Sequence, residues 1–348
     1  MADMLGDRWE IIRSLGEGGQ AHTFLVKDLH ADTATAFVLK RLKNPERIER
    51  FRREMAAVSQ LGHPNILHII DHRLEVPPHF FVTEYCEGGS LDRAEPYWHS
   101  SPSLAIDLFL DVCSAVEHAH SHNVIHRDVK PSNIFLRTAR GPAVLGDFGI
   151  CFLEAEAERL TLTEEAVGPR LFMAPELEDG RLDQVTPKCD IYSLGKLLYW
   201  LLSTCGVFSR EKHRDATWDL KGRNADASLG WGNIYFEHVN RLLDLMIVQD
   251  PERRRGAENI RILAKRTKRL IEKEYAPISP GLAAPCTFCG QGEYVERVSS
   301  SDQIFNFGWQ QIGTADWRVL VCDACGHVQL FRVEFASRKD WWGLDTKK

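Results

Sequence analysis

The chain has 348 residues, of which 26% are charged and 44% hydrophobic, and its formal net charge is −6 at pH 7. Its 25 glycines and 15 prolines are close to average usage, which argues against a collagen-like, low-complexity or fully disordered chain. The acidic balance supplies no overall basic field for nucleic acid or for an anionic membrane.

Length and hydropathy predict the organisation and location of the protein. At roughly 100–200 residues per domain, two or three domains are expected. Residues 1–10 lack the basic and then apolar pattern of a signal peptide. The longest apolar stretch, residues 191–208, contains Lys196 and is shorter than the roughly 20 residues of a membrane span. We therefore expect a soluble, cytoplasmic protein without a membrane partner.

Residues 8–85 favour short strands around a single helix. The helix is expected over residues 45–61, where apolar side chains recur at helical spacing. The strands are expected where β-branched and aromatic residues gather, at residues 9–15, 23–27, 36–42 and 80–85.

From about residue 103 to residue 275 the pattern becomes mainly helical. Residues 104–122 and 191–203 are long segments with apolar periodicity, and residues 259–275 are basic and amphipathic. The basic run is interpreted as a solvated helix face in preference to a phosphate-binding patch. The sequence therefore predicts a small β-rich lobe followed by a larger helical lobe.

Glycines and charged residues in the first lobe are arranged in a way that could serve a phosphate ligand. Gly16, Gly18 and Gly19 separate the first two strands, and backbone without side chains can approach phosphates closely. Lys40 lies on the strand at 36–42, and Glu54 on the following helix could supply its carboxylate partner. Taken singly, these features also fit a hairpin turn, a solvated lysine and a surface glutamate.

Three motifs follow in the helical region. They are His126-Arg-Asp-Val-Lys-Pro-Ser-Asn133, Asp147-Phe-Gly149 and Ala174-Pro-Glu176. With the glycine turn, Lys40 and Glu54, they form six elements in one order. In that order and spacing, residues 8–275 resemble the catalytic domain of eukaryotic-type serine/threonine protein kinases, in a compact form that looks bacterial.

The resemblance implies a fold, cofactors and a substrate class. The fold would be α+β, the bilobal protein kinase fold, with an N-lobe over residues 8–85 and a C-lobe over residues 86–275. The cofactors would be ATP with Mg²⁺ or Mn²⁺, and the substrate would be a protein. Because the transition state of phosphoryl transfer is loose, catalysis would depend on positioning and electrostatics.

The same resemblance assigns the phosphate and metal contacts. Lys40 would hold the α- and β-phosphates, and Glu54 would orient it. Asn133 and Asp147 would hold Mg²⁺ through oxygen atoms, which this hard cation prefers.

It also assigns the groups that act on the substrate hydroxyl. Asp128 would accept its proton. Lys130 matches the catalytic-loop lysine of serine/threonine kinases, which neutralises the γ-phosphate, so serine or threonine is favoured over tyrosine. Because all these residues are present, an active kinase is favoured over a nucleotide-binding pseudokinase that acts as a scaffold.

Adenine would lie between apolar walls, a gatekeeper and the backbone of the interlobe hinge. The gatekeeper would be Thr83, and Val38 stands where the family usually has alanine, which narrows the adenine slot. The full set of expected nucleotide-binding residues is Leu15, Gly16, Gly18, Gly19, Val38, Lys40, Thr83, Glu84, Cys86, Phe135 and Asp147.

Regulation by phosphorylation is also implied. Such kinases are commonly switched by a phosphate on the segment between residues 147 and 176, which pairs with the arginine of the catalytic loop, here Arg127. Thr161 and Thr163 are the candidate phosphosites, with unmodified loop residues as the alternative. Pro169 stands where the family usually has threonine, so substrate docking is expected to differ.

The last part of the chain has a different composition. Residues 276–285 are rich in proline, alanine and glycine and are interpreted as a linker. Residues 286–348 contain two C-x-x-C-G knuckles formed by Cys286, Cys289, Cys322 and Cys325. Four thiolates at this spacing can surround one tetrahedral ion, and a unit this small needs such a staple.

This last segment resembles a zinc ribbon or a rubredoxin-like module. We expect a small β-rich unit with structural Zn²⁺, in preference to iron, disulfides or free thiols. Its charge is nearly balanced, which favours a protein partner over nucleic acid. The alternative is an adaptor in which the ribbon binds nucleic acid or protein and the kinase acts as its switch.

Overall fold

The computed structural model describes residues 4–17, 21–31, 35–148, 171–178, 185–203, 208, 212–215, 220, 236–271, 283–286, 289, 293–297, 305–307, 310–312, 317–322 and 324–332. The chain divides into two compact units, residues 1–265 and residues 266–348.

The first lobe is an antiparallel sheet of six strands in the order β1-β2-β3-β4-β6-β5. Alternate residues of the strands point into one core, in which Leu39 is fully buried and pairs with Phe24 on one side and Val82 on the other. The strands are β1 (Met4–Leu5), β2 (Trp9–Glu17), β3 (Ala21–Asp28), β4 (Ala36–Leu42), β5 (Ile69–Arg73) and β6 (Phe80–Glu84).

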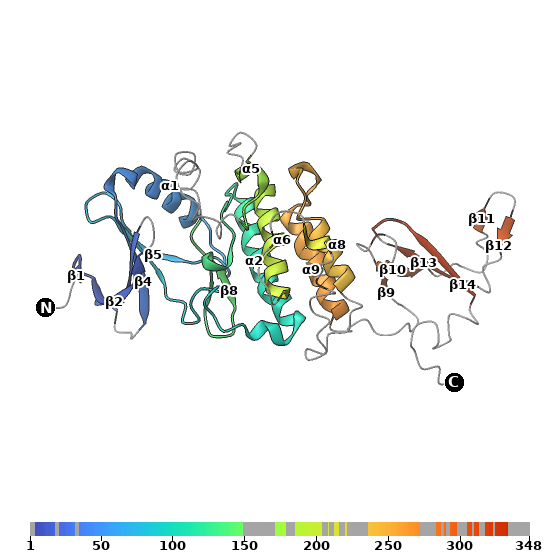
Figure 1. The fold of residues 1–348 in the computed structure, drawn as a ribbon, viewed down its shortest axis with the longest axis horizontal. Helices are drawn as coiled ribbons and strands as arrows, with labels where there is room; N and C mark the ends of the chain where they lie inside the picture. Colours follow the sequence, from blue (N-terminus) through green and yellow to red (C-terminus); the bar gives the residue numbers. More distant parts are fainter. Residues whose placement is uncertain are drawn as a thin grey trace. The chain divides into compact units, whose positions relative to one another are not determined.

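Helix α1 (Ile48–Ser59) packs on this sheet (Figure 1). A single helical turn precedes it, and the side chain of Asn44 caps that turn by accepting a hydrogen bond from the backbone N–H of Glu46. The apolar face of α1 is buried, and the ring of Phe51 lies 5.1 Å from that of Phe81 on β6. This packing fixes the helix that carries Glu54 beside the strand that carries Lys40.

Helices dominate the second lobe. The start of helix α2 is well defined by its sequence. The side chain of the N-cap residue Ser101 accepts a hydrogen bond from the backbone N–H of Ser103, and proline occupies the first helical position. Helix α6 packs against α2 and is buried along nearly its whole surface. The helices are α2 (Pro102–Ser121), α5 (Pro175–Glu178), α6 (Lys188–Leu202), α8 (Phe236–Asp244) and α9 (Ala257–Ile271).

A short hairpin lies at the junction of the two lobes. Its strands are β7 (Ile134–Leu136) and β8 (Ala143–Leu145), and they are paired antiparallel. Leu145 exchanges backbone hydrogen bonds with the turn that follows α1, donating to Asn65 at 2.8 Å and accepting from Leu67 at 2.8 Å. This attachment ties the hairpin of the second lobe to a segment of the first.

The second unit contains a four-stranded antiparallel sheet in the order β14-β13-β10-β9 and a separate hairpin of β11 and β12. The last three residues of the expected linker are therefore not a connection, because they form β9 and pair with β10. The strands are β9 (Ala283–Pro285), β10 (Glu293–Arg297), β11 (Phe305–Phe307), β12 (Gln310–Ile312), β13 (Trp317–Cys322) and β14 (Val328–Arg332).

The predicted elements of the first unit occur in the structure with small changes at their ends. The elements β1, β5, the β7–β8 hairpin, α5 and α8 were not predicted from the sequence. The first four are short, whereas α8 carries apolar residues at helical spacing, at Phe236, Val239 and Leu243, that were missed. Within the part of the chain that is described, none of the helices combines the length and the apolar character that crossing a membrane requires. Residues 191–202 of the expected apolar stretch belong to the buried helix α6, in which the Nζ atom of Lys196 donates to the carbonyl of Phe208.

Candidate active site

The loop between α2 and β7 brings three polar side chains together. The carboxylate oxygen Oδ2 of Asp128 lies 2.7 Å from Nδ2 of Asn133 and 2.7 Å from Nζ of Lys130. A second bond of 2.8 Å joins Nδ2 of Asn133 to the backbone carbonyl of Asp128. Lys130 and Asn133 together therefore hold the Asp128 carboxylate in one orientation. Because the Nδ2 atom of Asn133 is used in these bonds, the amide oxygen of Asn133 is the atom that could bind a cation.

Asp190 on α6 holds the backbone of this loop. Its buried carboxylate accepts hydrogen bonds from the backbone N–H groups of His126 at 2.8 Å and Arg127 at 2.7 Å, and it contacts Nε2 of His120 at 2.8 Å. Arg127 adopts a left-handed backbone with φ of 70°, which an L residue rarely adopts without such support. Although burial opposes the charged form, hydrogen bonds from His120 and the loop keep the pKa of Asp190 below its usual value.

His126 links the loop to the segment that follows β8. Its Nδ1 accepts from the backbone N–H of Asp128 at 3.2 Å, and its Nε2 lies 2.9 Å from the carbonyl of Gly146. The ring also packs on Phe148 with a centroid distance of 4.5 Å. Complete burial lowers the pKa of His126, so the imidazole is neutral at pH 7 and serves as a fixed connector.

Lys40 and Asp147 form an ion pair across the two lobes. Nζ of Lys40 on β4 contacts Oδ1 of Asp147, which lies just after β8 and has a left-handed backbone with φ of 52°. The two residues are 107 positions apart in the sequence. The backbone of Glu54 lies on α1, but its side chain is outside the described part of the structure.

The expected nucleotide-binding residues are placed at the junction of the lobes. Val38 on β4 pairs with Thr83 on β6, and Phe135 lies on β7. Leu15 and Gly16 lie at the end of β2, and Glu84 and Cys86 lie where the chain passes between the lobes. Burial raises the pKa of the Cys86 thiol to about 12, so it stays protonated. Gly18 and Gly19 are outside the described residues.

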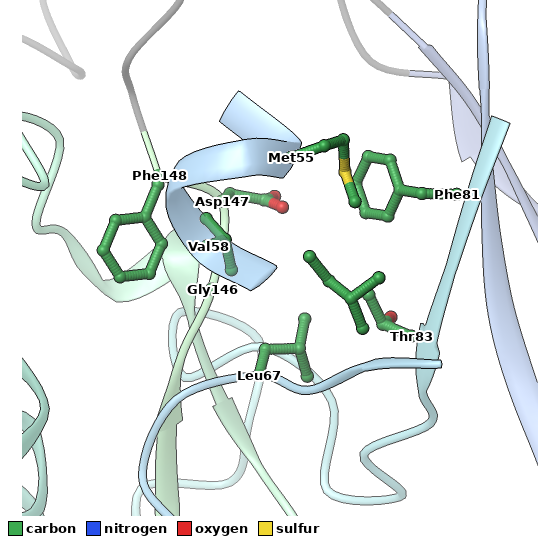
Figure 2. A pocket seen from close by; sticks show the side chains of 9 residues that line it. Met55, Val58, Leu67, Phe81, Thr83, Gly146, Asp147 and Phe148 are labelled. Atoms are coloured by element: carbon green, nitrogen blue, oxygen red, sulfur yellow. The ribbon is translucent and has the colours of Figure 1, made fainter. Parts of the chain in front are cut away.

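A small cavity of about 20 Å³ is lined by Thr83 of β6, Leu67 of the turn after α1 and Asp147. Figure 2 shows the carboxylate of Asp147 beside this space, with Met55 of α1 and Phe81 of β6 on one side and the Phe148 ring on the other. Met55 and Phe81 were not among the site residues predicted from the sequence. The apolar spacing of the helix carrying Met55 indicated burial, but not which side of the site it faces.

The segment expected to regulate the site is largely outside the described residues, and this includes Thr161, Thr163 and Pro169. One end of the expected interaction is described. Nε of Arg127 is buried and has no hydrogen-bond partner among the described residues.

The end of that segment is held by a buried ion pair. Glu176 on α5 accepts two hydrogen bonds from Arg254, at 2.6 and 2.9 Å, and both side chains are almost completely buried. This pair links α5 to the segment before α9. Arg254 also donates to the backbone carbonyls of Lys188, Val248 and Gln249.

The four cysteines of the second unit are also brought together. Their Sγ atoms all lie within 4.8 Å of one another, with 3.8 Å between Cys286 and Cys325 and 3.6 Å between Cys289 and Cys322. A tetrahedral ion with metal–sulfur bonds of about 2.3 Å places its sulfurs about 3.8 Å apart. Backbone N–H groups also point at sulfur, as with Cys325 N–H and Cys322 Sγ at 3.4 Å. The donor set therefore fits a tetrahedral metal ion.

Comparison with known proteins gives a consistent result. The family model for the protein kinase domain matches residues 9–262. Serine/threonine-protein kinase PrkC of Bacillus subtilis is 35% identical over 205 residues, which are 57% of this chain and 31% of PrkC. Serine/threonine-protein kinase PknB of Mycobacterium leprae is 34% identical over 207 residues, which are 57% of this chain and 33% of PknB. The chain thus matches about a third of the length of these relatives.

A comparison of folds agrees with the sequence match. The crystal structure of the Mycobacterium tuberculosis PknI kinase domain superposes with a TM-score of 0.55 and 21% sequence identity. The match covers 77% of this chain and 99% of that chain. The first unit therefore has the architecture of that domain, a sheet lobe followed by a helical lobe.

Proposed function

Because the chain belongs to the protein kinase family, we propose that it is an ATP-dependent serine/threonine protein kinase. It would transfer the γ-phosphate of ATP to serine or threonine hydroxyls of a protein substrate. The observation that carries the proposal is the pair of 2.7 Å contacts that Lys130 and Asn133 make with Asp128 in the helical lobe. It is joined by the ion pair between Lys40 of the sheet lobe and Asp147. The 34–35% identity to two serine/threonine-protein kinases supports the choice of hydroxyl.

The family uses ATP with Mg²⁺ or Mn²⁺, and the residues present suit both. Asp147 and the amide oxygen of Asn133 are hard oxygen ligands that would hold the metal ion, and Lys40, oriented by Glu54, would bind the phosphates. When bound, the metal ion neutralises charge on the phosphate oxygens. The apolar walls at Val38 and Phe135 would bind adenine.

Asp128 would accept the proton of the substrate hydroxyl as phosphorus–oxygen bond formation proceeds. Its carboxylate is oriented for this by Asn133 and Lys130. Lys130 would move from this ion pair toward the γ-phosphate. Because the donors hold the carboxylate before substrate arrives, little reorganisation is needed in the transition state.

The proposal is tested by phosphate transfer from labelled Mg-ATP, comparing the wild type with Asp128→Asn. We expect kcat to fall by about 10²–10⁴ with ADP affinity unchanged, since the general base alone is removed. Asp215→Asn, at an exposed position, is the matched control. A wild type that binds ADP without transferring phosphate would favour the pseudokinase scaffold instead.

We propose that Thr161 or Thr163 is autophosphorylated and that the phosphate pairs with Arg127. The buried Nε of Arg127 without a partner among the described residues supports this. Phosphosite mapping of the wild type and of Asp128→Asn tests it. Label on either threonine in the wild type alone is expected, and an unlabelled segment in an active enzyme would argue against it.

We propose that residues 8–275 form the kinase domain, with its lobes divided at residue 85, and that residues 286–348 form a zinc-ribbon-like domain. The four cysteines would hold structural Zn²⁺, which the near-tetrahedral sulfur distances support. Metal analysis should find one zinc per chain in the wild type and in Cys113→Ala, but none in Cys289→Ser. Retention of zinc by Cys289→Ser would contradict the site.

The ribbon would dock a protein partner or substrate of the kinase. Its nearly balanced charge over residues 286–348 is poorly suited to binding by phosphate neutralisation. Fluorescence anisotropy of the full chain with single- and double-stranded oligonucleotides at low salt should therefore show no binding. Tight, salt-dependent binding that disappears in Cys289→Ser would favour the nucleic-acid adaptor.

A further inference from the structure

Glu84 and Arg137 form an ion pair at the junction of the lobes. Glu84 is the last residue of β6, and Arg137 follows the last residue of β7. Nη1 of Arg137 lies 2.8 Å from Oε2 of Glu84, and Nη2 lies 3.0 Å from Oε1. Two parallel contacts between a planar guanidinium and a carboxylate fix orientation as well as distance.

Each partner of the pair also binds backbone of a third segment, the turn after α1. Nη2 of Arg137 donates to the carbonyl of Pro64 at 2.9 Å, and the backbone N–H of His68 donates to Oε1 of Glu84 at 3.2 Å. The backbone N–H of Glu87 in turn donates to the carbonyl of Arg137 at 3.2 Å. The pair therefore joins the hinge, the turn after α1 and the β7–β8 hairpin.

The hairpin that Arg137 anchors is the element that carries the proposed nucleotide contacts. Asn133 immediately precedes β7, Phe135 lies within it, and Asp147 follows β8 by two residues. The hinge begins at Glu84, the last residue of β6, and its backbone would bind adenine. The adenine of ATP would thus be bound by the hinge, and its phosphates with their metal ion by residues next to the hairpin. The Glu84–Arg137 pair connects these two chain segments.

We propose that Arg137 is a positioning residue for nucleotide binding, which through Glu84 holds the adenine-binding hinge in register with the Asn133 and Asp147 metal ligands. This inference rests on the proposed kinase function. It differs from a contact with ATP, because Arg137 acts only through the hinge and the hairpin. Holding both ends in place before binding lowers the ordering cost that the nucleotide would otherwise meet.

The geometry distinguishes this pair from an ordinary surface ion pair. The side chains of Arg137 and Glu84 are only 36% and 22% exposed, and both groups have further backbone partners. Arg261 and Glu117 form a comparable pair between α9 and α2, with 26% and 28% exposure, and neither residue belongs to the hinge or to the β7–β8 hairpin. The second pair is the matched control, because its loss should affect stability without affecting the nucleotide.

The test measures ADP affinity by calorimetry with the full chain. Arg137→Met and Glu84→Gln should each weaken ADP binding roughly three- to tenfold, and the double variant should lose no more than either alone, since coupled partners are not additive. Arg137→Lys should recover little, because an ammonium group cannot form the bidentate contact. Arg261→Met should bind ADP as the wild type does.

Steady-state kinetics provide a readout that a purely structural role would not change. The KM for ATP should rise in Arg137→Met while kcat at saturating ATP changes much less. If both single variants bind ADP as the wild type does, or if the losses in the double variant are fully additive, the proposed role of the Arg137–Glu84 pair is wrong. The proposed kinase function would not be affected by that result. If Arg137→Met does not fold, Glu84→Gln decides by the same criterion. A wild type that binds no ADP would overturn the proposed function, and with it the proposed role of the Arg137–Glu84 pair.

Discussion

Arg254 and Glu176 are 78 residues apart in the sequence and form a buried bidentate ion pair, with contacts of 2.6 and 2.9 Å. Such a pair costs desolvation energy to form, but removing one partner leaves the other charge uncompensated in the interior. Removing one partner should therefore lower the free energy of unfolding by more than the intact pair contributes to it.

We expect Glu176→Gln to lower the free energy of unfolding by about 3–5 kcal/mol, because the Arg254 cation loses its only carboxylate contact in the described structure. Chemical denaturation measures this loss. Glu252→Gln, at an exposed position near Arg254, is the control and should change stability little. A loss below about 1 kcal/mol in Glu176→Gln would show that the site tolerates the unpaired cation.

Gly195 on α6 permits close packing against the segment after α8. A Cβ atom at this position would lie 2.6 Å from Cγ1 of Ile247 and 2.9 Å from Cβ of Met246. Gly195→Ala should therefore destabilise the protein by about 1–3 kcal/mol, as overpacking of a core does. Thermal melting measures the change. Gly62→Ala, where no heavy atom lies within 4 Å, should have no comparable effect.

Stability should fall as the pH drops below about 6.5. Burial lowers the pKa of His126 and His63 from the ordinary value of 6.5, and the positive charge of His118 contributes at His63. The unfolded chain then takes up protons near pH 6.5 that the folded protein does not, so stability is complete above that pH and is lost below it. Denaturant titrations at pH 7.5, 6.5 and 5.5 measure the slope.

The contribution of one histidine can be isolated. His63→Gln should flatten this pH dependence, while His72→Gln, at an exposed position, should leave it unchanged. Equal slopes in all three proteins would show that His63 does not contribute. His63 contacts Ser114 Oγ at 3.2 Å, so a small loss of stability at pH 7.5 is expected in its variant and is separate from the slope.

Three cysteines of the kinase unit should resist alkylation in the folded protein. Burial raises the pKa of Cys86 to about 12 and the pKa values of Cys113 and Cys189 well above the usual range. Because the thiolate is the nucleophile, iodoacetamide at pH 7.5 should leave all three unmodified. Mass spectrometry locates the label, and the urea-unfolded chain is the control. Rapid labelling of Cys86 in folded protein would contradict its burial.

The local elements of the first lobe could be predicted because their patterns are periodic. The sequence predicted strands at 36–42 and 80–85, and the structure has β4 at Ala36–Leu42 and β6 at Phe80–Glu84. The sequence of β5, Ile-Ile-Asp-His-Arg, does not alternate apolar and polar residues, and β7 and β8 are three residues long, so periodicity did not reveal them. Residues 283–285 had the composition of a linker, but pairing with β10 makes them a strand.

The proposed catalytic groups were assigned from the sequence because they lie within short motifs, and their roles stay a prediction. Asp128, Lys130 and Asn133 fall within six residues, so their mutual contacts follow from one loop conformation. The bidentate contact of Glu84 with Arg137 could not be predicted from the sequence, because the two residues do not belong to one motif. Only the packing of the hairpin against the hinge brings them together.

The sequence by itself determined which chemical groups this protein has, namely the kinase motifs and four cysteines at knuckle spacing. The tertiary structure alone decided which of them meet. It pairs Lys40 with Asp147 across 107 positions, and it brings Sγ of Cys286 to 3.8 Å from that of Cys325 and Sγ of Cys289 to 3.6 Å from that of Cys322. The physical reason is that motif spacing constrains only neighbours along the chain, whereas long-range contacts depend on how buried faces of strands and helices pack together.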